Sequence, residues 1–510
     1  MQQPLSRRQL LAGVAGGTTA LAAGCQSVFG DENAGGSKTV ALSNPPTGGD
    51  WSMYGGAAPY YSPMHETLTA SSHDFSTIEP WLATEWETID DTTWEFTLRD
   101  GATFHNGEAL TADVVAESLS ALLADRPLSW AKVTDESFSA VDDRTLQVET
   151  VERFGALAGT LSHPLFGIQH PDSYDRPIGT GPFEAESAEP DSPLQTVRFE
   201  GYWGAEPQLE GLTFEGITDP TTRSTSLQAG EIDASFEIPR QDYELLSAND
   251  TVQVRTQREP RAGSAMINLY NSPTDDADLR RALNYAVDQQ SIVDSILSGI
   301  GAPAKGPYPP MIPFSAHDEL PEYGPDLQRA RELVDQSEYG GEDVELHVSS
   351  NTPHMQLIAT RMQDRFAEIG VSSTVRQFDR GSFFETEQMA ESNLTLIELG
   401  SINGAADYLV HLQFHSEGGD NRALYESEGT GLYNLGSEVD SLIEEGDRAL
   451  DKETKHEAYR EVQRRVMDQA VLVPIYYKEY VLGQRANTTG PETHAVPHMT
   501  RWTEFGHDGE

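Results

Sequence analysis

His411 and His415 are the residues whose type and spacing most directly suggest chemistry. They stand four positions apart, so in a helix both imidazoles would lie on one face and could bind a metal ion together. Leu412 and Gln413 follow His411, so the glutamate of a zinc protease motif is missing. The sequence leaves two interpretations open: a metal-binding pair, or histidines that pack or face solvent.

Aromatic residues form a second group that could contact a solute. Trp51, Tyr54 and Tyr408 could stack on a ligand, although buried aromatic residues more often belong to the core. The sequence has no GxSxG motif, phosphate-binding loop or metal-hydrolase motif. An anchored extracellular hydrolase is therefore only an alternative. We predict a binding protein that is not an enzyme and uses no cofactor.

The N-terminus has the features of an export signal. Arg7 and Arg8 match a twin-arginine signal, and the uncharged stretch Leu10–Gly24 is too short to span a bilayer stably. This stretch ends in a segment that resembles a lipobox, so Cys25, the only cysteine, is the predicted lipidation site. Residues 26–37 are a predicted polar tether. We expect export by the twin-arginine route and a lipid anchor on the outer face of the cytoplasmic membrane.

The composition is strongly acidic. The chain has 82 acidic and 34 basic residues, a net charge of -48, so it would repel nucleic acid. The acids are spread along the chain, which is typical of a protein kept soluble in molar salt. Apolar residues make up 37% and form periodic blocks that can build cores, which argues against disorder. We predict a salt-loving source and a fold that requires high salt.

The elements that must position these residues follow from hydrophobic periodicity. Residues 93–98 alternate as a half-buried strand, and Thr111 is the predicted cap of the next helix. One helical face is predicted from Leu279 to Leu297. Further strands are expected at 342–348, 371–375, 394–399 and 471–477, and helices at 354–368, 440–450 and 454–468. This alternation predicts α/β layers with largely parallel sheets.

A series of sequence blocks occurs in a recognisable order. The blocks are Pro80–Glu87, Trp94–Gly107, Leu110–Val115, Ile178–Phe183, Gly201–Gly204, Gly230–Asp233 and Leu279–Asp288. Together they resemble the peptide/nickel-binding family (family 5) of ABC-transporter solute-binding proteins, of the haloarchaeal lipoprotein type. Within the second block, we interpret His105 as a core or turn histidine rather than a ligand.

The resemblance implies a periplasmic-binding-protein-like fold (type II, cluster C), an α/β flytrap with two lobes and an extra inserted domain. After the signal (1–25) and tether (26–37), lobe I would comprise residues 38–54, 178–268 and 480–510, the inserted domain 55–177, and lobe II 269–479. Chain crossings near Asn268 and Tyr480 would form the hinge. The ligand would bind between the lobes, and the permease would recognise the closed form.

The resemblance leaves two ligand classes open. It implies a monomer that captures di- or oligopeptides, or a similar small polar solute, for the permease and ATPase subunits of an ABC importer. The alternative is nickel or another metal in chelated form. Where the nickel branch has an arginine before a proline, this chain has His163. Of the acidic segment that anchors peptides, only Asp407 is kept, and Arg422 could pair with a ligand carboxylate.

Overall fold

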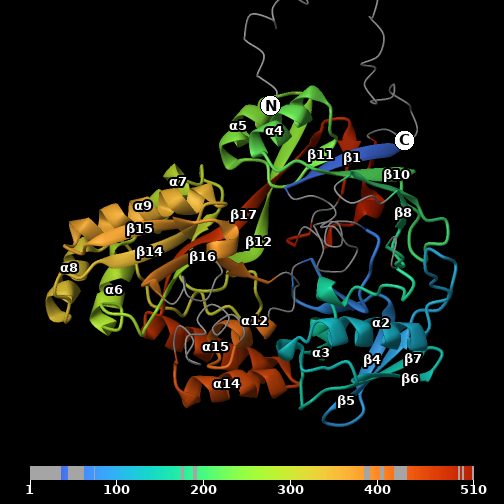
Figure 1. The fold of residues 1–510 in the computed structure, drawn as a ribbon, viewed down its shortest axis with the longest axis horizontal. Coiled ribbons are helices and arrows are strands. Elements are labelled where there is room, and N and C mark those ends of the chain that lie inside the picture. Colours follow the sequence, from blue (N-terminus) through green and yellow to red (C-terminus); the bar gives the residue numbers. More distant parts are fainter. Residues whose placement is uncertain are drawn as a thin grey trace, which may run out of the picture.

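A computed structural model describes residues 36–43, 63–73, 75–173, 177–187, 192–383, 391–401, 407–418, 434–491, 494–496 and 499–507. Figure 1 shows lobe II on the left, lobe I at the upper right and the inserted domain at the lower right. Among these residues, every helix is too short or too polar to cross a membrane. The residue boundaries of lobe I, lobe II and the inserted domain remain predictions.

One mixed sheet runs through both lobes, in the order β15-β14-β16-β12-β17-β11-β1-β10-β9-β8, with β13 paired to β17. Its strands are β1 (Ser37–Leu42), β8 (Phe183–Ser187), β9 (Leu194–Arg198), β10 (Gly211–Gly216), β11 (Ala234–Ser235), β12 (Val252–Ile267), β13 (Ala302–Pro303), β14 (Val344–Ser349), β15 (Ser373–Phe378), β16 (Leu394–Gly400) and β17 (Leu472–Arg485). Only the pairs around β1 and β14 are parallel among the described strands. The prediction of largely parallel sheets was wrong, because β12 and β17 run antiparallel to all their partners.

The long strands β12 and β17 connect the lobes. They are paired along most of their length, and their register is interrupted between Arg258 and Ala262. On one side β17 pairs with β11 of lobe I, and on the other β12 pairs with β16 of lobe II. Strand β12 therefore crosses between the lobes around Arg258–Ala262. The sequence had predicted this crossing a few residues later, near Asn268. On β17 the partners of Arg258 and Ala262 are Glu479 and Tyr477, which lie directly before Tyr480, the other predicted crossing.

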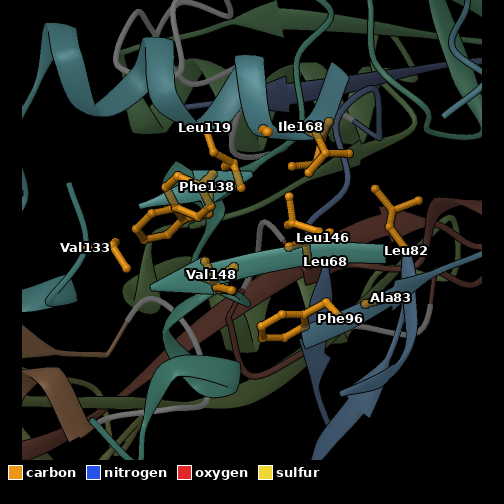
Figure 2. Close-up of a cluster of buried hydrophobic side chains, with 14 of the residues drawn as sticks. Leu68, Leu82, Ala83, Phe96, Leu119, Val133, Phe138, Leu146, Val148 and Ile168 are labelled. Atoms are coloured by element: carbon orange, nitrogen blue, oxygen red, sulfur yellow. The ribbon is translucent and has the colours of Figure 1, made fainter. Parts of the chain in front are cut away.

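The inserted domain has its own sheet, β4-β5-β7-β6, covered by α2. Its elements are β2 (Thr69–Ser71), β3 (Ile78–Pro80), β4 (Ala83–Thr88), β5 (Thr93–Leu98), α2 (Ala112–Asp125), η1 (Ser129–Ala131), β6 (Phe138–Asp142), β7 (Thr145–Glu149), α3 (Leu157–Thr160) and η2 (Pro164–Phe166). The predicted strand at 93–98 is confirmed, as is the cap, because Thr111 accepts a hydrogen bond from the backbone N–H of Val114. Leu119 of α2 packs with Phe138 and Leu146 in the core (Figure 2).

Helices cover both faces of the lobe II sheet. They are α6 (Ala277–Ala286), α7 (Gln289–Ser295), α8 (Leu327–Gln336), α9 (Pro353–Glu368), α10 (Arg380–Phe383), α12 (Asp407–Phe414), α14 (Ser437–Arg448) and α15 (Lys452–Asp468). The single helical face predicted from Leu279 to Leu297 is split into α6 and α7. The break occurs because Val287 is extended and Asp288 caps α7 by accepting from Ser291 N–H.

The remaining elements belong to lobe I and the C-terminal segment. They are α4 (Pro220–Ala229), η3 (Arg240–Asp242), α5 (Tyr243–Ser247), β18 (Thr488–Thr489), η5 (Trp502–Glu504) and β19 (Gly506–His507). Trp502 packs edge-on against Phe214 of β10, with ring centroids 5.3 Å apart. This contact joins the C-terminal segment to the lobe I core.

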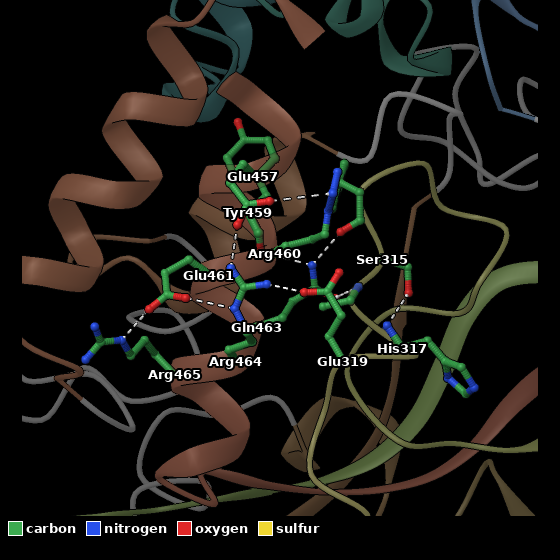
Figure 3. A network of polar contacts seen from close by, with 12 residues as sticks. Ser315, His317, Glu319, Glu457, Tyr459, Arg460, Glu461, Gln463, Arg464 and Arg465 are labelled. Atoms are coloured by element: carbon green, nitrogen blue, oxygen red, sulfur yellow. Dashed lines mark hydrogen bonds and ion pairs between the residues drawn. The ribbon is translucent and has the colours of Figure 1, made fainter. Parts of the chain in front are cut away.

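The outer face of α15 carries a network of ion pairs (Figure 3). Arg464 pairs with Glu457, Glu461 and Glu319, and Arg465 shares the Glu461 carboxylate. Glu319 belongs to a loop outside α15, so the network fastens that loop to the helix. Exposed pairs of this kind are individually weak and are screened by salt.

Candidate ligand-binding site

A cavity of about 340 Å3 lies between lobe I and the inserted domain. Its described lining includes His65, Glu66, Trp81, Tyr202, Trp203, His494 and Arg501. These side chains come from the start of the inserted domain, from a lobe I turn and from the C-terminal segment. The volume suits a small organic ligand, for which sites of roughly 300–1,000 Å3 are usual.

Glu66 is the centre of the polar network in this wall. Its Oε1 accepts from Trp81 Nε1 at 2.9 Å and from Tyr202 OH at 3.1 Å. Its Oε2 accepts from Thr180 Oγ1 at 2.8 Å and from Trp203 Nε1 at 3.0 Å. Burial raises the pKa of Glu66 to about 7, and the four donors oppose that rise. Because the donors fill the acceptor positions of the carboxylate, Glu66 joins the inserted domain to lobe I and leaves no site for a ligand.

His65 differs from its neighbour. Neither ring nitrogen of His65 has a hydrogen-bond partner among the residues that the structure describes. Burial, with a smaller contribution from nearby His105, lowers the pKa of His65 to about 3, so the ring is neutral. A neutral imidazole has one donor and one acceptor, as a peptide group does.

His105 is a structural histidine, as the sequence predicted. Its Nε2 donates to the carbonyl oxygen of Gly181 at 3.0 Å, and its Nδ1 accepts from the N–H of Gly179 at 3.2 Å. Both glycines belong to the turn at 179–182. A side chain at either position would meet the backbone of Pro63 or Met64 at 2.0 Å or less. The turn therefore packs directly against the segment that carries His65.

Several residues predicted from the sequence lie outside the described part of the chain. These are Cys25, Trp51, Tyr54 and Arg422. Asp407 is the first residue of α12, and its side chain is likewise outside the description. The predictions for these residues remain untested.

His163 and Tyr408, predicted as ligand contacts, lie against each other. Their ring centroids are 5.4 Å apart, and Trp130 lies 4.7 Å from Tyr408. His163 Nδ1 accepts from the N–H of Leu165, and burial lowers the pKa of His163 to about 3. A neutral ring cannot replace the positive charge of an arginine. These rings form a contact between the inserted domain and lobe II.

His411 and His415 do share one face, as predicted. Their rings are stacked, with centroids 4.4 Å apart and planes inclined by 5°. His411 Nδ1 donates to Asp447 at 2.8 Å, and His415 Nε2 lies 3.7 Å from Glu444. Within the described ranges, no group of three or more His, Cys, Asp or Glu side chains is arranged to hold a metal ion. Metal binding by His411 and His415 therefore stays a prediction, and the described residues offer no third ligand.

A buried ion cluster lies where the lobes join. Lys478 of β17 is 3.4 Å from Glu259 of β12, 3.1 Å from Glu398 of β16 and 3.9 Å from Glu237, which follows β11. Burial opposes the charge of the ammonium group, but the three carboxylates outweigh burial and raise the pKa of Lys478. The cluster therefore contacts strands of both lobes at the crossing.

The family is decided by a sequence comparison. Residues 77–421 match the family described as bacterial extracellular solute-binding proteins, family 5 Middle. The chain belongs to this family. Its homologues are solute-binding proteins of ABC transporters, which are not enzymes.

Relatives and solved structures extend the family assignment. This family 5 protein is 26% identical over 425 residues to the glutathione-binding protein GsiB of Salmonella typhimurium, covering 79% of this chain and 80% of the relative. NikA from Staphylococcus aureus in complex with Ni(L-His)2 has a TM-score of 0.77 at 20% identity, covering 93% and 100% of the two chains. DppA from Helicobacter pylori in complex with the peptide STSA has a TM-score of 0.74 at 19% identity, covering 93% and 98%. These structures confirm the predicted two-lobed α/β fold.

The cavity wall of this family 5 protein was not predicted from the sequence. Trp81 and Trp203 stand inside two of the blocks that carry the family resemblance, and Glu66 and His65 carried no signal of their own. The available signal was the position of the tryptophans beside glycine and proline, in the blocks Pro80–Glu87 and Gly201–Gly204. This position indicates a constrained backbone, but it does not show that both tryptophans bond to Glu66.

Proposed function

We propose that this family 5 protein captures di- or oligopeptides, or a similar small polar solute, outside the cell and delivers it to the permease and ATPase of an ABC importer. The cavity of about 340 Å3 carries the proposal, because its wall combines aromatic rings with a neutral His65 that has no partner among the described residues. Such a wall can bury a side chain, and we propose that a peptide group entering the cavity reaches the buried ring nitrogens of His65. The names of the relative GsiB and of the peptide complex of DppA favour the same ligand class.

Further ligand contacts are proposed from the segments that adjoin this wall. Pro63, which lines the cavity, directly follows the segment that holds Trp51 and Tyr54. We keep both aromatic residues as proposed stacking partners, with Asp407 and Arg422 as proposed charged contacts. His163 and Tyr408 are better explained as contacts between domains.

The cellular setting belongs to the same proposal. The twin arginines, the short apolar stretch and Cys25 support export in a folded state, followed by lipid anchoring to the outer face of the membrane. The net charge of -48 supports a salt-rich surrounding. We expect the protein to work as a monomer beside its permease.

A ligand screen by thermal shift in molar KCl tests the proposal. The ligands are di- to pentapeptides, glutathione, sugars, and Ni2+ with and without histidine. A ligand at 100 times its dissociation constant should stabilise the protein by about 2.7 kcal/mol. We expect a peptide-dependent rise in the melting temperature that is reduced in His65→Phe and kept in Leu357→Phe. Leu357 is a matched control because it lies exposed on α9, away from the cavity.

The outcomes separate the candidate functions. A rise that needs Ni2+ and disappears in both His411→Ala and His415→Ala would replace the peptide proposal with the metal-chelate alternative. No rise with any peptide or sugar, in a protein whose circular dichroism shows a folded state, would overturn the proposal of a peptide-class solute.

A further inference from the structure

We propose that residues 152–155 of the inserted domain and residues 447–450 at the end of α14 form a latch that holds lobe II closed against the inserted domain. The backbone N–H of Gly155 donates to the carbonyl oxygen of Asp447 at 2.9 Å. On the other side, Lys455 Nζ donates to the carbonyl oxygen of Gly155 at 3.4 Å. Two hydrogen bonds at the Gly155 backbone thus link residues about 300 positions apart across a domain boundary.

The latch leaves no room for a side chain at Gly155. A Cβ atom there would lie 1.9 Å from the carbonyl oxygen of Ala449 and 2.7 Å from its carbonyl carbon. The obstructing atoms are backbone atoms of lobe II, so a side chain could not be accommodated by a rotamer change. An alanine at 155 is compatible with the inserted domain itself but not with the closed arrangement.

Charged side chains border the same contact. Glu152 lies between Lys132 of its own domain, at 2.8 Å, and Arg448 of α14, at 3.4 Å. The hydrogen bond from Lys132 lowers the pKa of Glu152, so its carboxylate stays charged beside Arg448. The ion pair is partly exposed, so it adds little energy and mainly sets the register of the two surfaces.

The lobe II side of the latch is held rigid from behind. Asp447 is buried, and its carboxylate accepts from His411 Nδ1 at 2.8 Å and from Tyr459 OH at 2.7 Å. These bonds fix the end of α14 on α12 and α15. His411 therefore has a positioning role in the latch, because it holds the Asp447 side chain.

The latch depends on the relative position of the lobes. The inserted domain is joined to lobe I through Glu66, whereas residues 447–450 belong to lobe II. The lobes connect through the crossing near Arg258–Ala262, so a rotation there separates the two sides of the latch. A ligand that contacted both lobes would bind more weakly by the factor by which the closed population falls, whereas a ligand held only in the cavity between lobe I and the inserted domain would be unaffected.

Single-molecule FRET on the full chain, without ligand, tests the latch. In a Cys25→Ser background, dyes are placed at Ile89→Cys and Leu357→Cys, which are 50% and 59% exposed, on the inserted domain and lobe II. We expect Gly155→Ala to shift the dyes to a longer mean distance. The matched control is Gly324→Ala, because a Cβ there meets nothing within 4 Å and its backbone is not left-handed. Arg448→Gln should produce a smaller shift in the mean distance. Arg465→Gln, at an exposed position of α15, should produce no shift.

The outcomes are decisive for the latch. Wild-type distances in both Gly155→Ala and Arg448→Gln would overturn it. If circular dichroism shows that Gly155→Ala does not fold, Arg448→Gln decides alone. The latch rests on the two-lobed binding-protein fold that the proposed function assumes, but this readout contains no ligand. The two proposals can therefore fail separately. If Gly155→Ala opens the protein but the wild type binds none of the screened solutes, the latch is supported and the proposed ligand class is refuted.

Discussion

Lys478 Nζ lies 3.1 Å from a carboxylate oxygen of Glu398, and this ion pair joins a strand that crosses the hinge to a strand of lobe II. Glu259 and Glu237 approach the same ammonium group from the lobe I side. Three acidic side chains therefore share one buried cation where the lobes meet.

Replacing Lys478 by methionine should destabilise the protein strongly. Loss of the cation leaves Glu259 and Glu398 with only Arg261 and His354 as ion-pair partners among the described residues, and removing one partner of a buried ion pair typically costs about 3–5 kcal/mol. Urea unfolding measures the free energy of unfolding. Lys305→Met, which removes the exposed pair with Glu322, should change it by less than about 1 kcal/mol. Similar losses in both variants would contradict the role assigned to Lys478.

Glu66 should make the protein less stable as the pH rises from about 4.5 to 7. The pKa of Glu66 is raised to about 7 in the folded state, so between these values the folded state binds more protons than the unfolded state. Glu66→Gln loses hydrogen bonds at a cost of about 1–3 kcal/mol but removes this trend. Its stability relative to the wild type should improve across that interval. Glu87→Gln, exposed on β4, should keep the wild-type profile.

His163 should make the protein less stable as the pH falls. Its pKa is lowered to about 3 by burial, whereas an unfolded histidine binds a proton near pH 6.5. Unfolding below pH 6.5 is therefore favoured by about 1.4 kcal/mol per pH unit until about pH 3. His163→Asn keeps an acceptor for the N–H of Leu165 and removes the titration. A flatter stability profile in acid is expected, and an unchanged slope would refute it.

Salt should stabilise the fold. With a net charge of -48, dilution exposes the acidic side chains to their mutual repulsion, because the Debye length grows from about 3 Å at 1 M salt to about 10 Å at 0.1 M. We expect the melting temperature to fall steeply below roughly 0.5 M KCl. Sucrose at matched osmolality separates charge screening from solute exclusion. A melting temperature that sucrose restores as well as KCl does would argue against screening.

Local sequence patterns predicted the local structure well. The strand at 93–98 and the helix capped by Thr111 were readable because a strand repeats every two residues and a cap acts on its immediate neighbours. The ordered blocks identified the family and hence the two-lobed fold. The structural role of His105 followed from its place between glycines.

The cavity wall and the latch could not be read in this way. Glu66 receives its four hydrogen bonds from residues 15, 114, 136 and 137 positions away, and Gly155 meets Ala449 across a domain boundary. The packing of Tyr408 against Trp130, with ring centroids 4.7 Å apart, likewise joins residues far apart in the sequence. Composition, local elements and family were determined by the sequence alone, because each depends on neighbouring residues or on total charge. Which distant side chains become partners depends on the path of the chain through both lobes and on their closure, and only the tertiary structure decided that.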